Sequence, residues 1–558
     1  MTFNLSKHKN DLLFCPLGGS GEIGMNMNLY YMDGKWLMID YGAGFAEDYL
    51  PGIDMIVPDI SFIEKYKDDL LGVVITHAHE DHLGAIPYIW EELGMPIYAT
   101  PFTAAFLREK LGSNHPACKK GVIREIQQGS KFELGPFDLE LVQITHSVPE
   151  MNAVLVRTKF GNIFHSGDWK LDPKPVVGAV SDFDKMRKIG DEGVLAMISD
   201  STNVFSPGTS GSEGDLQESL IELVGQCKKM VIVTTFASNV ARVVSIAEAA
   251  RKNGRKVILA GRSLWRIVAA AKASGYLKDA PEFHEATELK RFKREEVLII
   301  STGCQGEPMA ATSKIATGNH RDITVRPEDS IIFSSKIIPG NDKRIFRLFN
   351  QFIKLGAEVL TEKDHFVHVS GHPNVDDMHE MYKMIRPQVA IPVHGEHVHM
   401  HEHVRLAKSW GVPSTIQVGN GDVVRLGPGA PEKITMVKAG EMGVDGNFLL
   451  SPDSKIMRMR RKLQRDGVLV VTLILNKHGE PAIRPIVSAP GTLDPKEDDD
   501  IFEDIMFEIE EALADSVKSS KKSPQEDRIE NITRSATRRV LKAVLAKNPP
   551  IEVNIKRI

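Results

Sequence analysis

The chain has 558 residues, of which 42% are hydrophobic and 26% are charged, and its formal net charge is −5. A chain of this length is too long for one hydrophobic core, so we expect two to four domains. The composition excludes a largely disordered protein and a globally basic surface. Positive potential for a polyanionic ligand would therefore have to be local, in a cleft.

Cysteine is scarce and widely spaced, with residues at positions 15, 118, 227 and 304. Without a CxxC pair, neither a thiolate zinc site nor a disulfide framework is expected. No apolar run follows a basic N-terminal start, and no stretch of about 18 apolar residues occurs, which argues against a signal peptide or a membrane span. We therefore expect a cytoplasmic protein with no membrane partner.

Apolar runs alternate with short helical segments over the first 205 residues. Four of these runs end in polar residues, and they lie at 35–42, 71–77, 137–147 and 161–168. A pattern of this kind predicts an α/β sandwich whose loops gather at one edge.

From residue 206 the pattern changes to continuous apolar strands separated by helices. The predicted strands lie at 228–239, 255–263, 295–307 and 329–336, and the helices between them at 240–254 and 264–275. This alternation is typical of a parallel sheet covered on both faces, in which ligands bind at the carboxyl ends of the strands. Residues 365–373 and 389–403 then resemble the first region again.

The C-terminal part begins with a basic segment at 451–466, which predicts a linker. It continues with two strands (467–488), an acidic helix (497–517), a Lys/Ser joint (518–523), a basic helix (525–547) and a last alternating strand (550–558). A domain of about 90 residues is small for a self-sufficient core. The exposed edge strand and the oppositely charged helices predict that this domain joins subunits into a homodimer or homotetramer. The alternative is a lid that packs only on its own chain.

The segment "THAHEDH" (76–82) carries His77, His79, Asp81 and His82 directly after a buried strand. A strand end that turns into a helix start can aim all four side chains at one point. A lone buried histidine is more often a satisfied core residue, but four such residues within six positions favour a metal site. Imidazole and carboxylate ligands suit Zn²⁺ and Mn²⁺.

The THxHxDH motif resembles the signature of the metallo-β-lactamase superfamily. The bridging aspartate and the last ligand histidine of this superfamily match Asp168 and His394. These two residues are 226 positions apart, a gap that resembles the β-CASP branch of nucleic-acid nucleases. The motifs "GGSGEIGMNMNLY", "HAHEDHLGAIPY", "TFASN", "GRSLWR" and "HVSGHP" together resemble the ribonuclease J family over essentially the whole chain. The implied fold is α/β: a metallo-β-lactamase αββα sandwich with an inserted α/β β-CASP domain and a small α+β C-terminal domain. The implied boundaries are 1–205 and 365–450 for the metallo-β-lactamase domain, 206–364 for the β-CASP domain, 451–466 for a linker and 467–558 for a C-terminal oligomerisation domain.

The resemblance implies two divalent metal ions per subunit: zinc, with manganese or magnesium as alternatives. One ion would take His77, His79 and His146, and the other Asp81, His82 and His394. Asp168 would bridge the two ions and Asp40 would support the ligands. Asp81 is also assigned to catalysis, His372 is the candidate acid, and Asp200 orients that region or, alternatively, caps a helix. The implied pocket for an RNA 5′-monophosphate comprises Ala237, Ser238, Asn239, His368, Val369, Ser370, Gly371 and His372.

Three further groups of residues have competing interpretations. Arg262, Arg266, Lys336, Lys343 and Arg344 are candidates for an RNA channel, although each alone is more often a solvated surface charge. His397, His399, His401 and His403 follow His394, but a helix beginning there would spread them over several faces, so only His394 is expected to bind metal. The glycines at 18–24 predict a tight turn beneath the active-site edge rather than a dinucleotide site.

The implied function is a two-metal ribonuclease that degrades and processes single-stranded RNA. A hydroxide bridging the metals would attack the phosphodiester. The enzyme would act as a 5′→3′ exonuclease that prefers 5′-monophosphorylated ends, and would also cut internally. The alternatives are a DNA-directed β-CASP nuclease, a small-molecule thioester or lactam hydrolase, and a non-catalytic RNA-binding scaffold. The long gap argues against the small-molecule hydrolase, and the complete ligand set argues against the scaffold.

Overall fold

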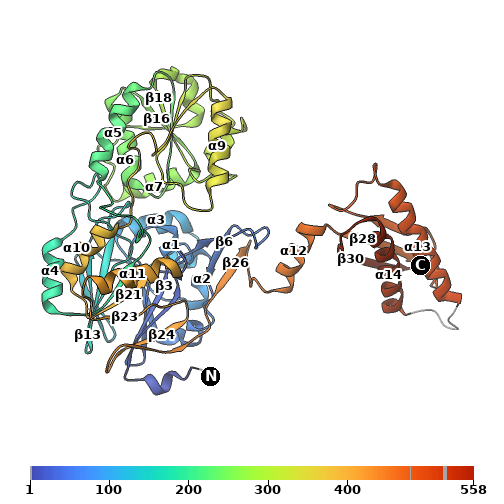
Figure 1. Cartoon of the computed structure of the whole chain (residues 1–558), viewed down its shortest axis with the longest axis horizontal. Helices are drawn as coiled ribbons and strands as arrows, with labels where there is room; N and C mark the ends of the chain where they lie inside the picture. The colour runs from blue at the N-terminus through green and yellow to red at the C-terminus, as the bar shows by residue number, and fades with distance from the viewer. Residues whose placement is uncertain (1–2, 478, 519–524) are drawn as a thin grey trace. The chain divides into compact units, whose positions relative to one another are not determined.

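The computed structural model of the chain describes residues 3–477, 479–518 and 525–558. It comprises two compact units (Figure 1): unit 1 consists of Met1–Gly44 and Ile56–Glu441, and unit 2 of Phe45–Met55 and Met442–Ile558. All of the predicted Lys/Ser joint (518–523) except its first residue lies outside the described residues. Among the helices that are described, none combines the length and the apolar character that a membrane crossing requires.

Unit 1 contains a sandwich of two sheets. The eight-stranded sheet has the order β25-β24-β1-β3-β4-β7-β8-β9. Its strands are β1 (Leu12–Gly18), β3 (Met27–Met32), β4 (Lys35–Ile39), β7 (Leu70–Val74), β8 (Ile97–Ala99), β9 (Ile123–Glu125), β24 (Asp422–Gly427) and β25 (Glu432–Met436). Every residue of β1 and β3 is buried, because both faces of this sheet are covered.

The second sheet of the sandwich has seven strands in the order β10-β11-β12-β13-β14-β21-β23. They are β10 (Lys131–Leu134), β11 (Phe137–Gln143), β12 (Asn152–Thr158), β13 (Gly161–His165), β14 (Val194–Asp200), β21 (Val389–Val393) and β23 (Ser414–Thr415). Residues of both sheets, among them Phe14, Tyr30, Leu139 and Val156, form one core between them. The predicted sandwich is therefore confirmed.

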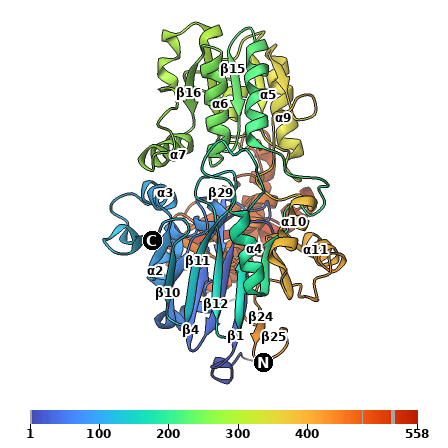
Figure 2. The same cartoon turned by 90° about the vertical axis from the view of Figure 1, so that its left-hand side faces the viewer.

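Helices cover the outer faces of the sandwich (Figure 2). They are α2 (Ile86–Leu93), α3 (Pro101–Leu111), α4 (Phe183–Glu192), α10 (Val375–Ile385) and α11 (His397–Ser409). Met186 and Ile189 of α4 pack with Met381 of α10 in a second core on the outer face of the seven-stranded sheet. Val142 of β11 belongs to this second core and Glu140 is buried with ion pairs to Arg157 and Lys185, so four consecutive residues of β11, 139–142, are buried instead of alternating.

An inserted domain of unit 1 is built on a six-stranded sheet with the order β17-β16-β18-β15-β19-β20, in which every pairing is parallel. The strands are β15 (Val231–Thr234), β16 (Lys256–Ala260), β17 (Phe283–Glu285), β18 (Val297–Ser301), β19 (Ser330–Phe333) and β20 (Glu358–Leu360). The helices are α5 (Glu213–Gln226), α6 (Val240–Lys252), α7 (Arg262–Ala273), α8 (Ala311–Ala316) and α9 (Asp342–Lys354). The parallel sheet predicted for this region is confirmed.

The insert leaves the sandwich after β14 and returns before β21. These two strands are parallel neighbours in one sheet, with Asp200 paired to Val393. The long sequence gap between Asp168 and His394 therefore closes inside a single sheet.

Unit 2 ends in a three-stranded sheet, β29-β28-β30, packed against two helices. The elements are β27 (Phe448–Leu450), α12 (Lys455–Asp466), β28 (Leu469–Leu475), β29 (Ile486–Ser488), α13 (Asp499–Lys518), α14 (Glu526–Val544) and β30 (Ile551–Arg557), preceded by β26 (Glu441–Asp445). Where the sequence predicts a linker at 451–466, the structure has helix α12. Ser454 caps this helix by accepting a hydrogen bond from the Met457 amide, and Arg460 pairs with Asp445.

Shorter elements complete the chain: α1 (Glu80–Leu83), β2 (Ser20–Gly21), β5 (Gly44–Phe45), β6 (Met55–Pro58), β22 (Gly395–Glu396), and 3-10 helices at Leu5–His8, Ile63–Asp69, Pro116–Cys118, Ala286–Arg291 and Arg294–Glu296. Of these, α1, β2 and β22 lie at the candidate site. β2 pairs with β22, so the glycine-rich turn at 18–24 lies directly beside His394.

Candidate metal centre

The candidate ligands come from strand ends of both sandwich sheets. His77 and His79 follow β7, and α1 carries Asp81 and His82 in its single turn. His146 follows β11, Asp168 follows β13, and His394 follows β21. The fold thus gathers residues that are up to several hundred positions apart in sequence at one edge of the sandwich.

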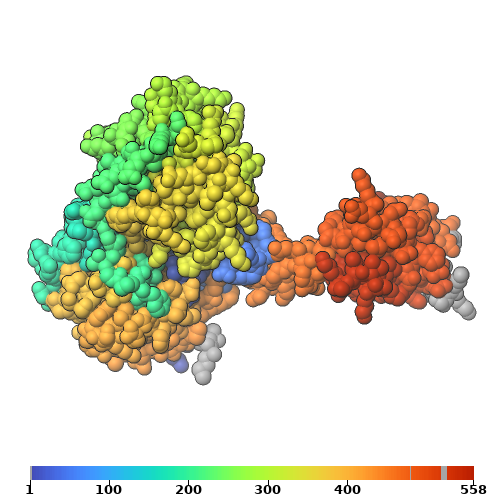
Figure 3. Space-filling model, turned by 45° about the horizontal axis from the view of Figure 1, so that its top comes forward, coloured from blue at the N-terminus to red at the C-terminus, as the bar shows by residue number. Residues whose placement is uncertain are grey.

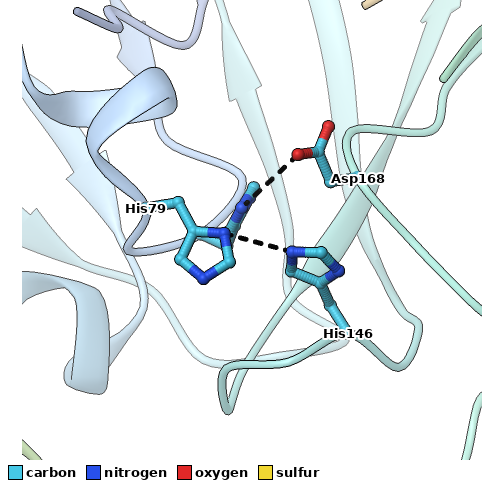
Figure 4. Close-up of side chains that lie close together, drawn as sticks. His79, His146 and Asp168 are labelled. Atoms are coloured by element: carbon cyan, nitrogen blue, oxygen red, sulfur yellow. Dashed lines mark hydrogen bonds and ion pairs between the residues drawn. The ribbon is translucent and has the colours of Figure 1, made fainter. Parts of the chain in front are cut away.

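The seven side chains form two groups that share Asp168. His77, His79 and His146 join Asp168 in one group, and Asp81, His82 and His394 join it in the other, with the possible ligand atoms of each group within 4.8 Å of one another. The Asp168 Oδ2 atom lies 3.0 Å from His82 Nε2 and 3.4 Å from His394 Nε2. Figure 4 shows His79, His146 and Asp168 turned toward one another. These are the two sets that the sequence predicts, with the predicted bridging residue between them.

Four of the histidines are each held through Nδ1. The partners are the Thr76 hydroxyl for His77 (3.0 Å), the Asp40 carboxylate for His82 (2.7 Å), the Gly371 carbonyl for His146 (2.6 Å) and the Asn26 side-chain oxygen for His394 (3.0 Å). This arrangement leaves Nε2 of each ring directed at the centre. Fixing one ring nitrogen so that the other can coordinate is how proteins orient metal-binding histidines.

The chemistry of the centre fits divalent cations. Among the described residues, His77 Nε2, His394 Nε2 and Asp168 Oδ1 are buried polar atoms without a hydrogen-bond partner. Burial holds the pKa of His77 and His146 well below the usual range and lowers the pKa of His79 to about 4, so these rings are neutral and offer a lone pair. Borderline ligands of this type suit zinc and manganese.

The carboxylates of the centre supply the negative charge that a cation needs. Burial alone would raise the pKa of Asp168, but His394 and His82 outweigh it and hold that pKa well below the usual range. Burial disfavours a charged His82 ring, yet Asp168, Asp40 and Asp81 outweigh burial and hold the pKa of His82 well above its usual range. At Nε2 of His82, which faces Asp168 and Asp81, a divalent cation can take the place of a proton, while Asp40 holds Nδ1.

Asp40 and Asn26 support the centre from the eight-stranded sheet. Asp40 has a left-handed backbone (φ 64°) and accepts hydrogen bonds from the Thr76 amide (2.8 Å) and hydroxyl (2.9 Å) as well as from His82. Asn26 holds His394 and donates to the Asp81 carbonyl (3.1 Å). Asn26 was not among the predicted site residues, and its place just after the glycine-rich turn is the one signal in the sequence that points to it. Gly42 lets the Asp81 backbone lie close to residue 42, because a Cβ on that residue would lie 1.8 Å from the Asp81 carbonyl oxygen.

His372 and Asp200 form a pair beside the two metal groups. His372 Nδ1 lies 2.8 Å from Asp200 Oδ2 and 3.9 Å from Asp168 Oδ2. Burial lowers the pKa of His372, but Asp200 outweighs it and the net result is a pKa of about 9, so the ring carries a proton. Asp200 also accepts hydrogen bonds from the Thr202 amide (2.8 Å) and hydroxyl (2.7 Å), so it closes a turn and orients His372 at once.

The predicted phosphate pocket comes from two loops, 234–239 and 368–372. Ala237, Ser238 and His368 are partly exposed, whereas Val369 is buried. Asn239 caps α6 by accepting from the Arg242 amide (2.8 Å), and Gly371 gives its carbonyl to His146. The Ser370 hydroxyl accepts from Asn203 (2.7 Å) and from the His372 amide (3.0 Å). Several predicted phosphate contacts therefore also have structural hydrogen bonds.

Arg242 connects the two loops, a role that no sequence pattern indicates. Its side chain is fully buried and pairs with Glu213 (Nε to Oε1, 2.7 Å). It also donates to the carbonyls of Ser334 (2.9 Å), Val367 (3.4 Å) and Val369 (3.3 Å). One guanidinium group thus fixes the 365–371 segment against the inserted domain.

The remaining candidates lie away from the metal groups. His403 is buried between the hydroxyls of Ser201 (2.9 Å) and Tyr382 (3.0 Å). His397, His399 and His401 belong to none of the potential ligand groups found among the described residues. The five channel candidates, Arg262, Arg266, Lys336, Lys343 and Arg344, are all exposed on the inserted domain.

A sandwich with a His/Asp centre at its edge and an inserted parallel-sheet domain defines a metal-dependent hydrolase of the metallo-β-lactamase superfamily with a β-CASP insert. Family models agree along the chain: "Beta-lactamase superfamily domain" matches residues 51–186, "Ribonuclease J, beta-CASP domain" 228–352, "Zn-dependent metallo-hydrolase RNA specificity domain" 356–416 and "Ribonuclease J C-terminal domain" 455–558. The chain belongs to the ribonuclease J family, and it is a metal-dependent ribonuclease.

The similarity to relatives extends over nearly the full length. The chain is 37% identical to ribonuclease J of Sinorhizobium meliloti, with 98% of each chain covered. It is 34% identical to ribonuclease J of Helicobacter pylori (strain ATCC 700392 / 26695), covering 97% of this chain and 79% of the relative. It is 35% identical to ribonuclease J of Thermus thermophilus, covering 85% and 83%. The family resemblance stated from the motifs is thus confirmed.

Proposed function

We propose that the protein degrades single-stranded RNA from the 5′ end at a two-metal centre, prefers 5′-monophosphorylated ends, and also cuts internally. The observation that carries the proposal is the pair of four-residue groups joined by Asp168. Two binding positions that share a carboxylate suit a phosphodiester, which must be held on both sides of the reacting phosphorus. Zinc is the proposed metal, with manganese and magnesium as alternatives.

Two divalent cations bound there would supply an activated water and offset negative charge on the phosphate. The remaining steps fall to the chain. The water oxygen joins phosphorus, the bond to the 3′ oxygen breaks, and that oxygen needs a proton. The protonated ring of His372 lies beside Asp168 and is the proposed donor. Asp200 is a positioning residue, since it holds the His372 ring through Nδ1. The products are a 5′-phosphate and a 3′-hydroxyl.

The proposed preference for the 5′ end depends on the pocket at 237–239 and 368–372. The hydroxyls of Ser238 and Ser370, with backbone N–H groups of these loops, are the proposed contacts of a terminal phosphate. A pocket of this kind excludes the bulkier triphosphate. The predicted domain boundaries, the cytoplasmic location and the assembly through residues 467–558 are part of the same proposal.

The test compares labelled RNA with matched DNA. The full-length protein is incubated with 5′-labelled single-stranded RNA carrying a monophosphate or a triphosphate, with a DNA strand of the same sequence, and with a chelator control. We expect labelled mononucleotides from monophosphorylated RNA, slower release from the triphosphate, and no products after chelation. Faster cutting of DNA than of RNA would favour the DNA-directed alternative, and equal rates on both RNA ends would contradict the proposed pocket.

A further inference from the structure

Helix α9 of the inserted domain presents cations that the metal centre does not use. Lys343, Arg347 and Lys354 are exposed. Their spacings of four and seven residues place them along one side of the helix. Within the described part of the chain, none of the three makes an ion pair. Figure 3 shows the α9 surface, in yellow, facing the viewer.

An exposed aromatic ring lies within this basic row. Phe346 is 46% exposed, between Lys343 and Arg347 in the sequence of α9. Its ring packs on Phe349 (centroids 5.5 Å apart), which packs on the buried Phe333 (4.6 Å). Lys363 lies over the Phe346 ring at 5.7 Å. Phe346 is therefore held from below and flanked by cations, a combination found where proteins bind single-stranded nucleic acids.

A small apolar pocket opens beside Phe346. Its volume is about 230 Å³, and its walls include Phe333, Ile345, Phe349 and Val359. The carboxylates of Glu362 and Asp364 also line this pocket. Carboxylates disfavour a phosphate at the pocket, whereas they accept hydrogen bonds from the amino groups of a base. The basic row therefore suits the RNA backbone, and the pocket suits a base.

The basic row begins at the edge of the insert that adjoins the metal centre. Ser334 follows β19, accepts hydrogen bonds from Arg242, and donates its hydroxyl proton to the Val367 carbonyl of the 365–371 segment. The exposed Lys336 comes two residues later, and α9 starts at Asp342. From Lys343 to Lys354 the helix advances about 17 Å, at about 1.5 Å per residue. The row thus leads away from the edge that carries the candidate phosphate loops.

We propose that this α9 surface, defined by Lys343, Phe346, Arg347 and Lys354 with the adjacent pocket, binds a single-stranded part of the RNA substrate outside the metal centre. Phosphates lie along the three cations, and one base stacks on Phe346 and enters the pocket. The proposal rests on the proposed function, because it takes RNA as the substrate. It adds a second contact that long RNA reaches and short RNA does not.

Binding is measured with full-length protein carrying Asp81→Asn, so that the RNA stays intact. Fluorescent single-stranded RNAs of about 4 and about 20 nucleotides are titrated at several salt concentrations. Lys343→Gln/Arg347→Gln/Lys354→Gln should lower the slope of log affinity against log salt for the long RNA by about 2, since each lost phosphate contact contributes about 0.7. Phe346→Ala should weaken long-RNA binding about 5- to 100-fold and leave that slope unchanged. The short RNA should respond to neither.

The matched control removes three exposed cations of unit 1 that lie outside α9, with Lys65→Gln/Lys188→Gln/Arg321→Gln. It should leave the long-RNA slope near that of the parent. An equal fall in both triple variants would mean non-specific attraction and overturn the proposal. Phe346→Leu, which keeps the apolar packing but removes the stacking ring, replaces Phe346→Ala if thermal unfolding shows that the alanine variant is poorly folded.

Unchanged long-RNA binding in both α9 variants would also overturn the proposal. If the α9 variants instead lose binding of a polyglutamate probe, the surface belongs to an acidic protein partner, and the RNA proposal is wrong. Because these assays measure binding, they are independent of turnover. Failure of the wild-type protein to cut RNA would refute the proposed function, whereas unchanged slopes in a protein that cuts RNA would refute only the α9 site.

Discussion

The ring of His146 is held by the carbonyl of Gly371, which lies 2.6 Å from its Nδ1 atom although the two residues are 225 positions apart. Because a carbonyl can only accept, His146 carries its proton on Nδ1 and presents Nε2 to the centre. Gly371 belongs to the loop proposed to hold the terminal phosphate. The binding of that phosphate and the orientation of one proposed metal ligand therefore depend on the same backbone segment.

The proposed ligands can be tested through metal content. Asp81→Asn or His82→Ala should remove turnover and lower bound metal while leaving the fold intact, because these residues lie on a short helix at the sandwich edge. Metal analysis, circular dichroism and RNA turnover provide the readouts. His401→Ala, on the exposed side of α11, is the control and should retain metal and activity. Near wild-type turnover in the Asp81 or His82 variant, free of contaminating nuclease, would refute the assignment.

Asp40 should act on metal affinity without touching the metal. In Asp40→Asn the side chain can no longer accept from both Thr76 and His82 with two equivalent oxygens. We expect metal affinity to fall about 10- to 100-fold. The measurement is a competition titration of metal-free protein against a chelating dye. Asp68→Asn, an exposed aspartate elsewhere on unit 1, should match the wild type, and an Asp40 variant that does the same would show that the support is dispensable.

The proposed phosphate pocket predicts a change of preference rather than a general loss. Ser238→Ala combined with Ser370→Ala should reduce the advantage of 5′-monophosphate over 5′-triphosphate RNA more than it reduces internal cutting. The rates of mononucleotide release and of internal cleavage are measured on the same RNA. Because Ser370 also accepts from Asn203, each single variant is needed to separate pocket from loop effects. A parallel fall of both rates would argue against a pocket for the terminal phosphate.

Arg242 should be required for stability of the insert and for the shape of the loop at 365–371. Arg242→Ala leaves Glu213 buried without its cation, and breaking a buried pair costs about 3–5 kcal/mol. Urea unfolding measures that loss. Arg242→Ala/Glu213→Ala should recover part of it, because the unpaired charge is gone. If Arg242→Ala unfolds at the same urea concentration as the wild type, the Arg242–Glu213 ion pair does not stabilise the insert.

The C-terminal part should control assembly. β30 is the last strand of its sheet, and no described strand pairs with its outer edge. We predict that the full-length chain is a homodimer or homotetramer and that truncation after Leu450 yields monomers. The truncated chain should keep its metals, since the proposed ligands end at His394, and should lose activity on long RNA. Mass measurement in solution decides: a monomeric full-length chain, or an unchanged oligomer after truncation, contradicts the assignment.

The candidate metal ligands could be singled out from the sequence because their spacing is itself a chemical signal. The run from His77 to His82 needs no knowledge of distant contacts, and the gap before His394 identifies the insert. The apolar strands of the sandwich likewise predict the core between its two sheets. Segment 451–466 was predicted as a linker because of its charges, yet it forms a helix that Ser454 caps and in which Met457 is buried.

Asp40 was predicted as a support, but Asn26 and Arg242 could not be predicted, because their roles exist only after folding. Asn26 touches His394 across 368 positions, and neither residue has a local pattern that signals the other. Arg242 lies at a helix start where an arginine usually faces solvent, and Glu213, Ser334 and the returning residues 367–369 enclose it only in the folded chain. The basic row on α9 is visible in the sequence, but the exposed ring and the pocket beside it are not.

The order of the ligands along the chain has a consequence for protein synthesis. Translation delivers all four members of the first metal group by residue 168, whereas the second group lacks His394 until the whole insert has been made. β21, which directly precedes His394, also pairs with the edge of β14. A ribosome-bound chain that ends before this strand therefore has an incomplete centre. On the proposed mechanism, the nascent enzyme stays inert toward the messenger RNA that encodes it until most of its length has emerged.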